Sequence, residues 1–162
     1  MSENSLREEL YAAFKNRAMM YHHIYRELVK EVGERRATEI LKQSIYHRGI
    51  EIGSKFKQYA PHDLNGLREA FLAAVPDGGH MFQPEVVHCD DTRLDIQLNR
   101  CPLKDAWQEA GLAEGEIARL CHIAAAVDDG TFEGAGFSFS AETWQPGQKG
   151  CCLLKIRPGQ GE

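Results

Sequence analysis

The sequence has no apolar run that approaches the roughly 20 residues needed to span a bilayer. Its first residues, Met1 to Asn4, are polar and lack the basic and apolar regions of a secretory signal. It also has no excess of positive charge, because 19 Lys and Arg residues against 24 Asp and Glu residues give a formal net charge of −5. This balance argues against a dominant nucleic-acid or anionic-membrane surface. We therefore expect a cytoplasmic protein with neither a membrane nor a nucleic acid as its partner.

Cysteine pairs of the CxxC type are absent as well. The five cysteines lie at positions 89, 101, 121, 151 and 152, and no two of them form a CxxC pair. The sequence therefore excludes a zinc ribbon and a thioredoxin motif. In a reducing compartment such cysteines are expected to be free thiols, many of them buried as small hydrophobic side chains.

The composition is that of an ordinary globular protein. The chain has 162 residues, of which 43% are hydrophobic and 27% are charged, so it can bury a core without disulfides or metals. We expect a single domain over residues 1–162. Its helical part should cover about 5–75, and a part built as hairpin, helices and hairpin should cover about 84–157.

Apolar residues recur at helical spacing along the first half of the chain. They predict a first helix over 5–33, a second over 37–56 and a third over 63–75. The second helix carries Gly49 and Gly53 one turn apart. Small residues at this spacing favour close packing against the first helix over room for a ligand.

Beyond residue 84 the apolar period changes to two. The pattern predicts strands at 86–90, 94–99, 137–142 and 151–157, with helices at 102–110 and 114–127 between the second and third strands. The two hairpins can join as one antiparallel four-stranded sheet with helices on one face, which is an α+β fold. Alternation in the last strand turns Cys152 toward the interior and Cys151 toward the opposite face.

Cys101 ends a strand-like alternation, and Pro102 follows it. Proline is favoured in the first turn of a helix, so Cys101 is expected at a helix N-terminus. The free N–H groups and the helix dipole at that position stabilise a thiolate and lower the thiol pKa. Cys101 is therefore a candidate nucleophile, and a capping or packing thiol is the alternative interpretation.

The helix that follows supplies a second cysteine and a carboxylate. Cys121 lies on its apolar stripe, and Asp128 follows two helical turns later on the same face. A carboxylate on such a face needs a partner or a raised pKa, so Asp128 is a candidate general acid or base; a solvated carboxylate at a helix exit is the alternative. Burial alone is the commoner explanation for Cys121. His47 and His122 are the histidines best placed to deprotonate a thiol or water.

The chain resembles the L-2-amino-thiazoline-4-carboxylic acid hydrolase family in the order and spacing of one set of residues. They are Cys101-Pro102-Leu103, Trp107, Gly111, Leu120-Cys121, Asp128, Gly150 and Cys152. The resemblance covers most of the chain and is most specific from 100 to 156. The adjacent pair Cys151 and Cys152 departs from the single cysteine of the family, which aligns better with Cys152.

This resemblance implies a hydrolase that opens a small carboxylated heterocycle, such as a 2-aminothiazoline-4-carboxylate, with water and without a cofactor. Such a ring carries an amidine-like carbon that a cysteine thiolate can attack, and water would then resolve the covalent adduct. The expected catalytic residues are Cys101, Asp128, Cys121, Cys152 and His47, and the expected substrate-binding residues are Trp107 and Arg100. Arg119 and Lys155 are alternatives to Arg100 as partners of the substrate carboxylate.

Two other interpretations stay open. One is a non-catalytic small-molecule-binding or sensor module built on the same core. The other is a zinc-dependent hydrolase in which Cys101, Cys121 and Cys152 join Asp128 or His122 in a tetrahedral set, although no short ligand pair supports it. A small molecule is the expected partner in each case, and assembly into a homo-oligomer is left open.

Overall fold

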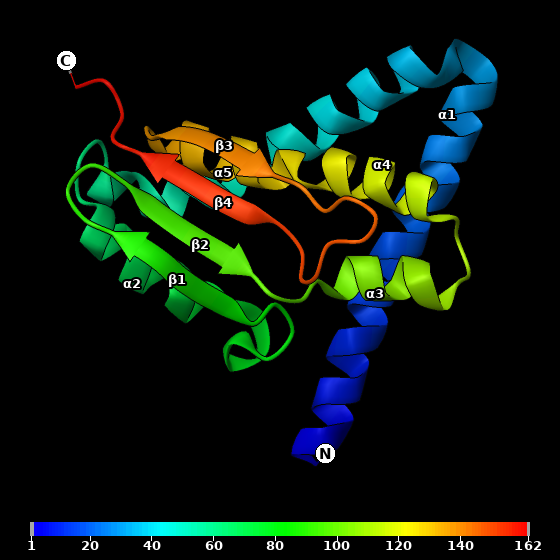
Figure 1. The fold of residues 1–162 in the computed structure, drawn as a ribbon, viewed down its shortest axis with the longest axis horizontal. Helices are drawn as coiled ribbons and strands as arrows, with labels where there is room; N and C mark the ends of the chain where they lie inside the picture. The colour runs from blue at the N-terminus through cyan, green and yellow to red at the C-terminus, as the bar shows by residue number, and fades with distance from the viewer. Residues whose placement is uncertain (1, 162) are drawn as a thin grey trace.

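A computed structural model describes residues 2–161 as a set of helices packed against one antiparallel sheet (Figure 1). In chain order the elements are α1 (Glu3–Gly53), the 3-10 helix η1 (Ser54–Tyr59), α2 (Leu64–Ala74), the short η2 (Pro76–Gly79), β1 (Pro84–Cys89), β2 (Leu94–Leu98), α3 (Pro102–Glu109), α4 (Glu114–Ala124), α5 (Ala126–Ala135), β3 (Ser138–Glu142) and β4 (Leu153–Arg157). This is the α+β fold that the sequence predicts. Within residues 2–161, no helix combines the length and the apolar character needed to cross a membrane.

Helix α1 changes direction at Gly33, where the sequence predicts the end of the first helix. Gly33 has φ 79° and ψ 164°, a backbone conformation that glycine adopts without steric cost, and the helix resumes directly after it. The two arms of α1 therefore run in different directions (Figure 1). The first arm contacts α3, where the Trp107 indole donates a hydrogen bond of 2.8 Å to the carbonyl of Ala18. The second arm packs along α5.

The two predicted hairpins join into one sheet through their inner strands. The strand order is β1-β2-β4-β3, and all neighbours are antiparallel. Alternate residues of the central strands, such as Ile96 and Ile156, are fully buried. They face the layer that contains α2 and α5, which lie behind the sheet in Figure 1. The sheet thus covers the helical core on one side.

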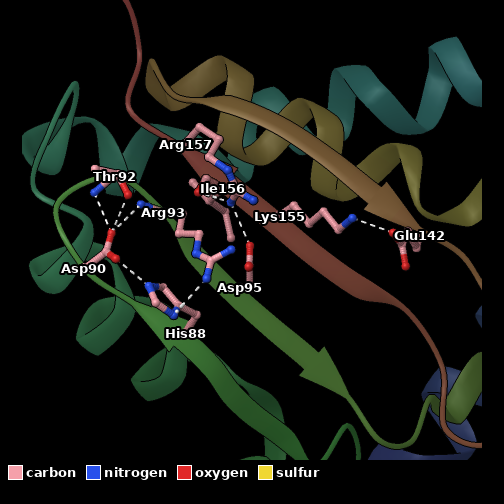
Figure 2. A network of polar contacts seen from close by, with 9 residues as sticks. All are labelled: His88, Asp90, Thr92, Arg93, Asp95, Glu142, Lys155, Ile156 and Arg157. Carbon is pink, nitrogen blue, oxygen red and sulfur yellow. Dashed lines mark hydrogen bonds and ion pairs between the residues drawn. The ribbon is translucent and has the colours of Figure 1, made fainter.

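The opposite face of the sheet carries charged side chains. Arg157 donates a hydrogen bond of 2.7 Å to Asp95, Lys155 pairs with Glu142, and His88 bonds Asp90 (Figure 2). Hydrogen bonds from His88 and Thr92 hold the pKa of Asp90 below its usual value. This network satisfies the charges of the open face, and none of its residues lines the cavity described below.

The predicted end of a helix at 127 is wrong. Helix α4 ends at Ala124, and α5 begins at once and carries Asp128 in its first turn and Gly130 after it. Gly130 sits inside a helix because its missing side chain allows a close approach to α1. A Cβ atom there would lie 2.1 Å from the carbonyl oxygen of Tyr46. Tertiary packing therefore overrides the low helix propensity that suggests a helix exit.

Glycines also line the α1 side of this contact. A Cβ atom on Gly49 would lie 2.3 Å from the carbonyl oxygen of Val127, and one on Gly53 would lie 2.1 Å from that of Thr131. Packing, rather than room for a ligand, is thus the reason for both glycines, as the sequence favours. The partner is α5, however, and not the first helix. The sequence pattern shows that one face of the helix carries small residues, but it does not show which helix packs on that face.

We expect Gly49→Ala to destabilise the protein by about 1–3 kcal/mol, because the added methyl group meets backbone atoms that cannot move aside without separating α1 from α5. Gly115→Ala is the matched control, since Gly115 is an exposed helical glycine and no atom lies within 4 Å of the place where its methyl group would stand. The free energy of unfolding of Gly115→Ala should rise by up to about 1 kcal/mol, because alanine has a higher helix propensity than glycine. Urea denaturation measures both changes, and equal stabilities for the two variants would contradict the close contact.

Candidate active site

A cavity of about 430 Å³ is lined by residues of α1, α2, α3, α4 and α5 and by the two cysteines that precede β4. Its walls are mostly apolar, with aromatic side chains from α1, α2 and α3. Its polar lining consists of four cysteines and a few other side chains: Cys101, Cys121, Cys151, Cys152, Arg17, Tyr21, Arg48, Lys55, Asp128 and Thr131. An apolar cavity of this size with a few converging polar groups is the usual form of a small-molecule site.

Cys101 is the N-cap residue of α3, as the sequence predicts from the following proline. Its backbone is extended, with φ −143° and ψ 120°, and Pro102 occupies the first helical turn. The pKa of Cys101 is lowered, first by hydrogen bonding with the Cys151 thiol and then by the N–H groups of Leu103 and Lys104, against the opposing effect of burial. The side chain makes no capping bond of standard geometry, so the two N–H groups act by proximity at the helix N-terminus.

Cys151 and Cys152 lie side by side in a β-bulge that precedes β4. The N–H of Cys151 donates to the carbonyl of Leu98 at 2.9 Å, and the N–H of Leu98 donates to the carbonyl of Cys152 at 2.8 Å. Cys151 and Cys152 therefore both lie opposite Leu98. Such a bulge changes the direction of the side chains relative to a regular strand. Both cysteines are 7% exposed, with their Sγ atoms 3.6 Å apart. The interior position of Cys152 is confirmed, and the expectation that Cys151 faces the opposite side is wrong.

The three interacting thiols have unequal acidities. Hydrogen bonding with Cys101 raises the pKa of Cys151, and hydrogen bonding with Cys151 together with burial raises the pKa of Cys121. Cys101 is the member of this set whose pKa is lowered. The arrangement therefore concentrates thiolate character on Cys101 and keeps its neighbours as neutral donors.

Asp128 reaches the cavity from the first turn of α5. Burial, and secondarily the charge of Asp129, raises the pKa of Asp128 to about 7, while Arg17 opposes this shift. The apolar surroundings of a half-buried side chain disfavour the carboxylate, which is the condition that suits a carboxyl group to proton transfer near neutral pH. The interpretation of Asp128 as a solvated helix-exit residue does not hold.

Trp107 lines the cavity and is fully buried. Its indole N–H is engaged with Ala18 on α1, so the ring offers an apolar face to the cavity rather than a donor. Two other predicted site residues lie elsewhere. His47 is exposed and contacts Gln43 at 3.0 Å, and Arg100 is exposed and pairs with Asp105 at 2.7 Å. Neither is among the lining residues, so neither enters the proposal below.

Metal-binding side chains do not converge in the part of the chain that the structure describes. Over residues 2–161, no group of three or more His, Cys, Asp and Glu side chains is arranged to hold a metal ion. His122, one candidate ligand, is exposed outside the cavity, with its Nε2 3.2 Å from Nζ of Lys42. Metal analysis of the purified protein addresses the zinc interpretation.

Sequence reasoning missed Arg17. The signal was present, because Arg17 interrupts the apolar stripe that contains Phe14 and Tyr21 on the cavity side of α1. Arg100 is next to Cys101 in the sequence and still lies outside the cavity lining, so adjacency along the chain does not place a side chain in the site.

The fold and the site together define an α+β protein with an apolar cavity, one activated thiol and one carboxyl group of raised pKa. The sequence profile of the L-2-amino-thiazoline-4-carboxylic acid hydrolase family matches residues 13–155. The chain belongs to this family, which confirms the resemblance, and it is classed thereby as a hydrolase. No curated protein matches the chain.

The fold is also similar to that of a solved structure with a different name. That structure is a trafficking protein particle complex subunit 3 from Naegleria fowleri, covalently bound to palmitic acid. The TM-score is 0.52 at 15% sequence identity, and the match covers 92% of this chain and 96% of that one. At this identity the likeness establishes a shared fold.

We expect Cys151→Ala to shift the pH midpoint of Cys101 alkylation upward, because the variant removes the largest contribution to the lowered pKa. The rate at pH 7 should fall by up to about tenfold for each unit of the shift. Iodoacetamide labelling followed by peptide mass spectrometry measures it. Cys89→Ala, at a cysteine outside the cavity, is the control and should leave the rate unchanged. An unshifted midpoint in Cys151→Ala would show that Cys151 does not activate Cys101.

The stability of the Asp128→Asn variant relative to the wild-type protein should increase as the pH rises. The folded-state pKa of about 7 lies above the usual value of 3.8, so the folded wild-type protein binds the extra proton and loses stability as the pH rises from about 4 to about 7. The asparagine variant has no such loss. Urea denaturation of both proteins across this range measures the growing difference, with Asp91→Asn at an exposed turn as the matched control. A difference that stays constant with pH would contradict the raised pKa.

Proposed function

We propose that this protein hydrolyses a small carboxylated heterocycle of the 2-aminothiazoline-4-carboxylate type, with Cys101 as nucleophile and Asp128 as proton carrier. The observation that carries this proposal is that a thiol of lowered pKa and a carboxyl group of raised pKa line the same cavity. The family membership supports the substrate class. Free thiols in the described chain suit the reducing cytoplasm, where we place the activity.

In the first step the Cys101 thiolate attacks the ring carbon that carries the sulfur and both nitrogens. Neutral Asp128 gives its proton to the ring nitrogen, which makes that carbon more electrophilic. The bond from the carbon to the ring sulfur then breaks, because a thiolate leaves far more readily than an amide anion. The product is an isothiourea joined through its carbon to Cys101, with the former ring sulfur as a thiolate and Asp128 as a carboxylate.

In the second step water attacks the carbon bound to Cys101. The Asp128 carboxylate accepts a proton from this water, and the Cys101–carbon bond breaks as the new carbonyl forms. The remaining hydroxyl proton goes to the free sulfur of the product. Cys101 returns as thiolate and Asp128 as neutral acid, and the net reaction adds one water to give an open-chain ureido acid with a free thiol. A carboxyl pKa near 7 allows Asp128 to serve in both directions.

The other cavity residues support this chemistry. Cys151 donates to the thiolate and stabilises it between turnovers. Cys121 and Cys152 fill the cavity wall as small buried side chains, and Trp107 gives the ring an apolar face to stack on. The expected roles of Cys121 and Cys152 are therefore positional, and their thiols are not the attacking groups.

Cys101→Ser should lower ring opening by at least about 100-fold, because serine has no stable anion at neutral pH. The fold should survive, since serine caps a helix well. Steady-state appearance of the product thiol from 2-aminothiazoline-4-carboxylate measures the rate, and circular dichroism checks the fold. A folded Cys101→Ser variant with near-normal turnover would overturn the covalent mechanism.

A second candidate is a non-catalytic module in which a cavity cysteine holds an acyl chain as a thioester. It is favoured by the mostly apolar cavity around Cys101 and by the covalent palmitic acid in the structurally similar trafficking subunit. Incubation with palmitoyl-coenzyme A and intact-protein mass spectrometry separates the two. A stable acyl adduct on a cavity cysteine together with no ring opening would favour this module over the hydrolase.

A further inference from the structure

Arg17 places a cation on the cavity wall. It lies on α1 with its guanidinium 5.7 Å from the ring centre of Phe14 and 5.5 Å from that of Tyr21. Its Nε donates a hydrogen bond of 3.1 Å to the hydroxyl of Tyr21. The two aromatic rings and this bond fix the direction of a side chain that otherwise has many rotamers.

The described residues give Arg17 no ion pair. Arg48 pairs with Glu51, and Arg7 pairs with Asp77, whereas no ion pair among residues 2–161 includes Arg17. The bond to the Tyr21 hydroxyl uses one of the five N–H donors of a guanidinium. A preorganised cation with unused donors on an apolar wall is a site for an anion.

Asp128 does not supply the missing charge. Burial and the charge of Asp129 raise the pKa of Asp128 to about 7, and the charge of Arg17 has a smaller, opposing effect. Near neutral pH the carboxyl group is therefore only partly ionised. Asp128 therefore leaves much of the positive charge of Arg17 uncompensated, which suits a ligand that carries a carboxylate.

We propose that Arg17 is the residue that binds the carboxylate of the substrate, by a two-pronged guanidinium–carboxylate contact. This inference rests on the proposed function and assigns its specificity to carboxylated rings. A planar guanidinium fits a carboxylate through two parallel N–H···O bonds, which also fixes the orientation of the attached ring. A bound carboxylate would in addition neutralise Arg17 and so remove its opposition to the raised pKa of Asp128. Substrate binding thereby keeps Asp128 protonated for the first step.

The test uses unreactive probes, so it does not depend on turnover. Calorimetry compares thiazole-4-carboxylate with thiazole-4-carboxamide on the wild-type protein, Arg17→Gln, Arg17→Lys and Arg26→Gln. Arg26 is an exposed residue of the same helix and is absent from the cavity lining, so Arg26→Gln is the matched control. Thermal unfolding of each variant checks the fold.

Wild type and Arg26→Gln should bind the carboxylate at least about tenfold more tightly than the amide, as expected for hydrogen bonds between charged groups. Arg17→Gln should lose this preference, and Arg17→Lys should retain part of it because the charge remains. Equal binding of the two probes to wild type, no binding of either, or a preference that persists in Arg17→Gln would overturn the inference.

A separate ring-opening assay distinguishes this inference from the proposed function. Carboxylate preference that depends on Arg17 in a protein without ring-opening activity would support the anion site and reject the hydrolase reaction. Ring opening in a protein whose carboxylate preference survives Arg17→Gln would support the hydrolase reaction and reject the role of Arg17. The two claims can thus fail independently.

Discussion

The backbone contact between α1 and α5 is the constraint on which the site depends. Gly49 and Gly53 on α1 face Gly130 and its neighbours on α5 so closely that a single methyl group on either side would meet backbone atoms. This spacing brings the first turn of α5, with Asp128, against the wall that α1 builds. A wider separation would open the same space to water, and the pKa of Asp128 would return toward its ordinary value.

The cavity shifts the pKa values of two acidic groups in opposite directions. The difference comes from the local partners of each group. Cys101 is partly buried, yet hydrogen bonding with Cys151 and the N–H groups at the start of α3 favour its anion. Asp128 is not the target of comparable donors, so burial dominates and favours its neutral form. A thiolate and a protonated carboxylic acid in one cavity are the two groups that nucleophilic attack with proton donation requires. The opposed shifts therefore link the geometry to the proposed reaction.

The sequence predicts much of the frame because its signals are local. Alternation marks the hairpins, and a proline directly after Cys101 marks the start of α3, since the conformational preference of proline acts on its neighbours. The position of Asp128 could not be predicted in the same way. The glycine two residues after it is a helix-exit signal locally, and only its contact with α1 explains why the helix continues.

Two further features of the site depend on contacts that are distant along the chain. The bulge that brings Cys151 and Cys152 to the same side is formed against Leu98, more than 50 residues earlier, and strand alternation contains no sign of it. Likewise, Arg17 lies far from the cysteines in the sequence and joins them only through the packing of α1. Local patterns thus identify the reactive groups, and the tertiary structure decides which of them meet.

Detection of the covalent intermediate tests the proposed mechanism most directly. Wild-type protein is mixed with 2-aminothiazoline-4-carboxylate, quenched with acid within the first turnover and analysed by intact-protein and peptide mass spectrometry. We expect an added mass equal to the whole substrate, located on the peptide that contains Cys101, because ring opening removes no atom from the adduct. Continued product formation with no adduct, or with an adduct confined to another cysteine, would contradict the mechanism.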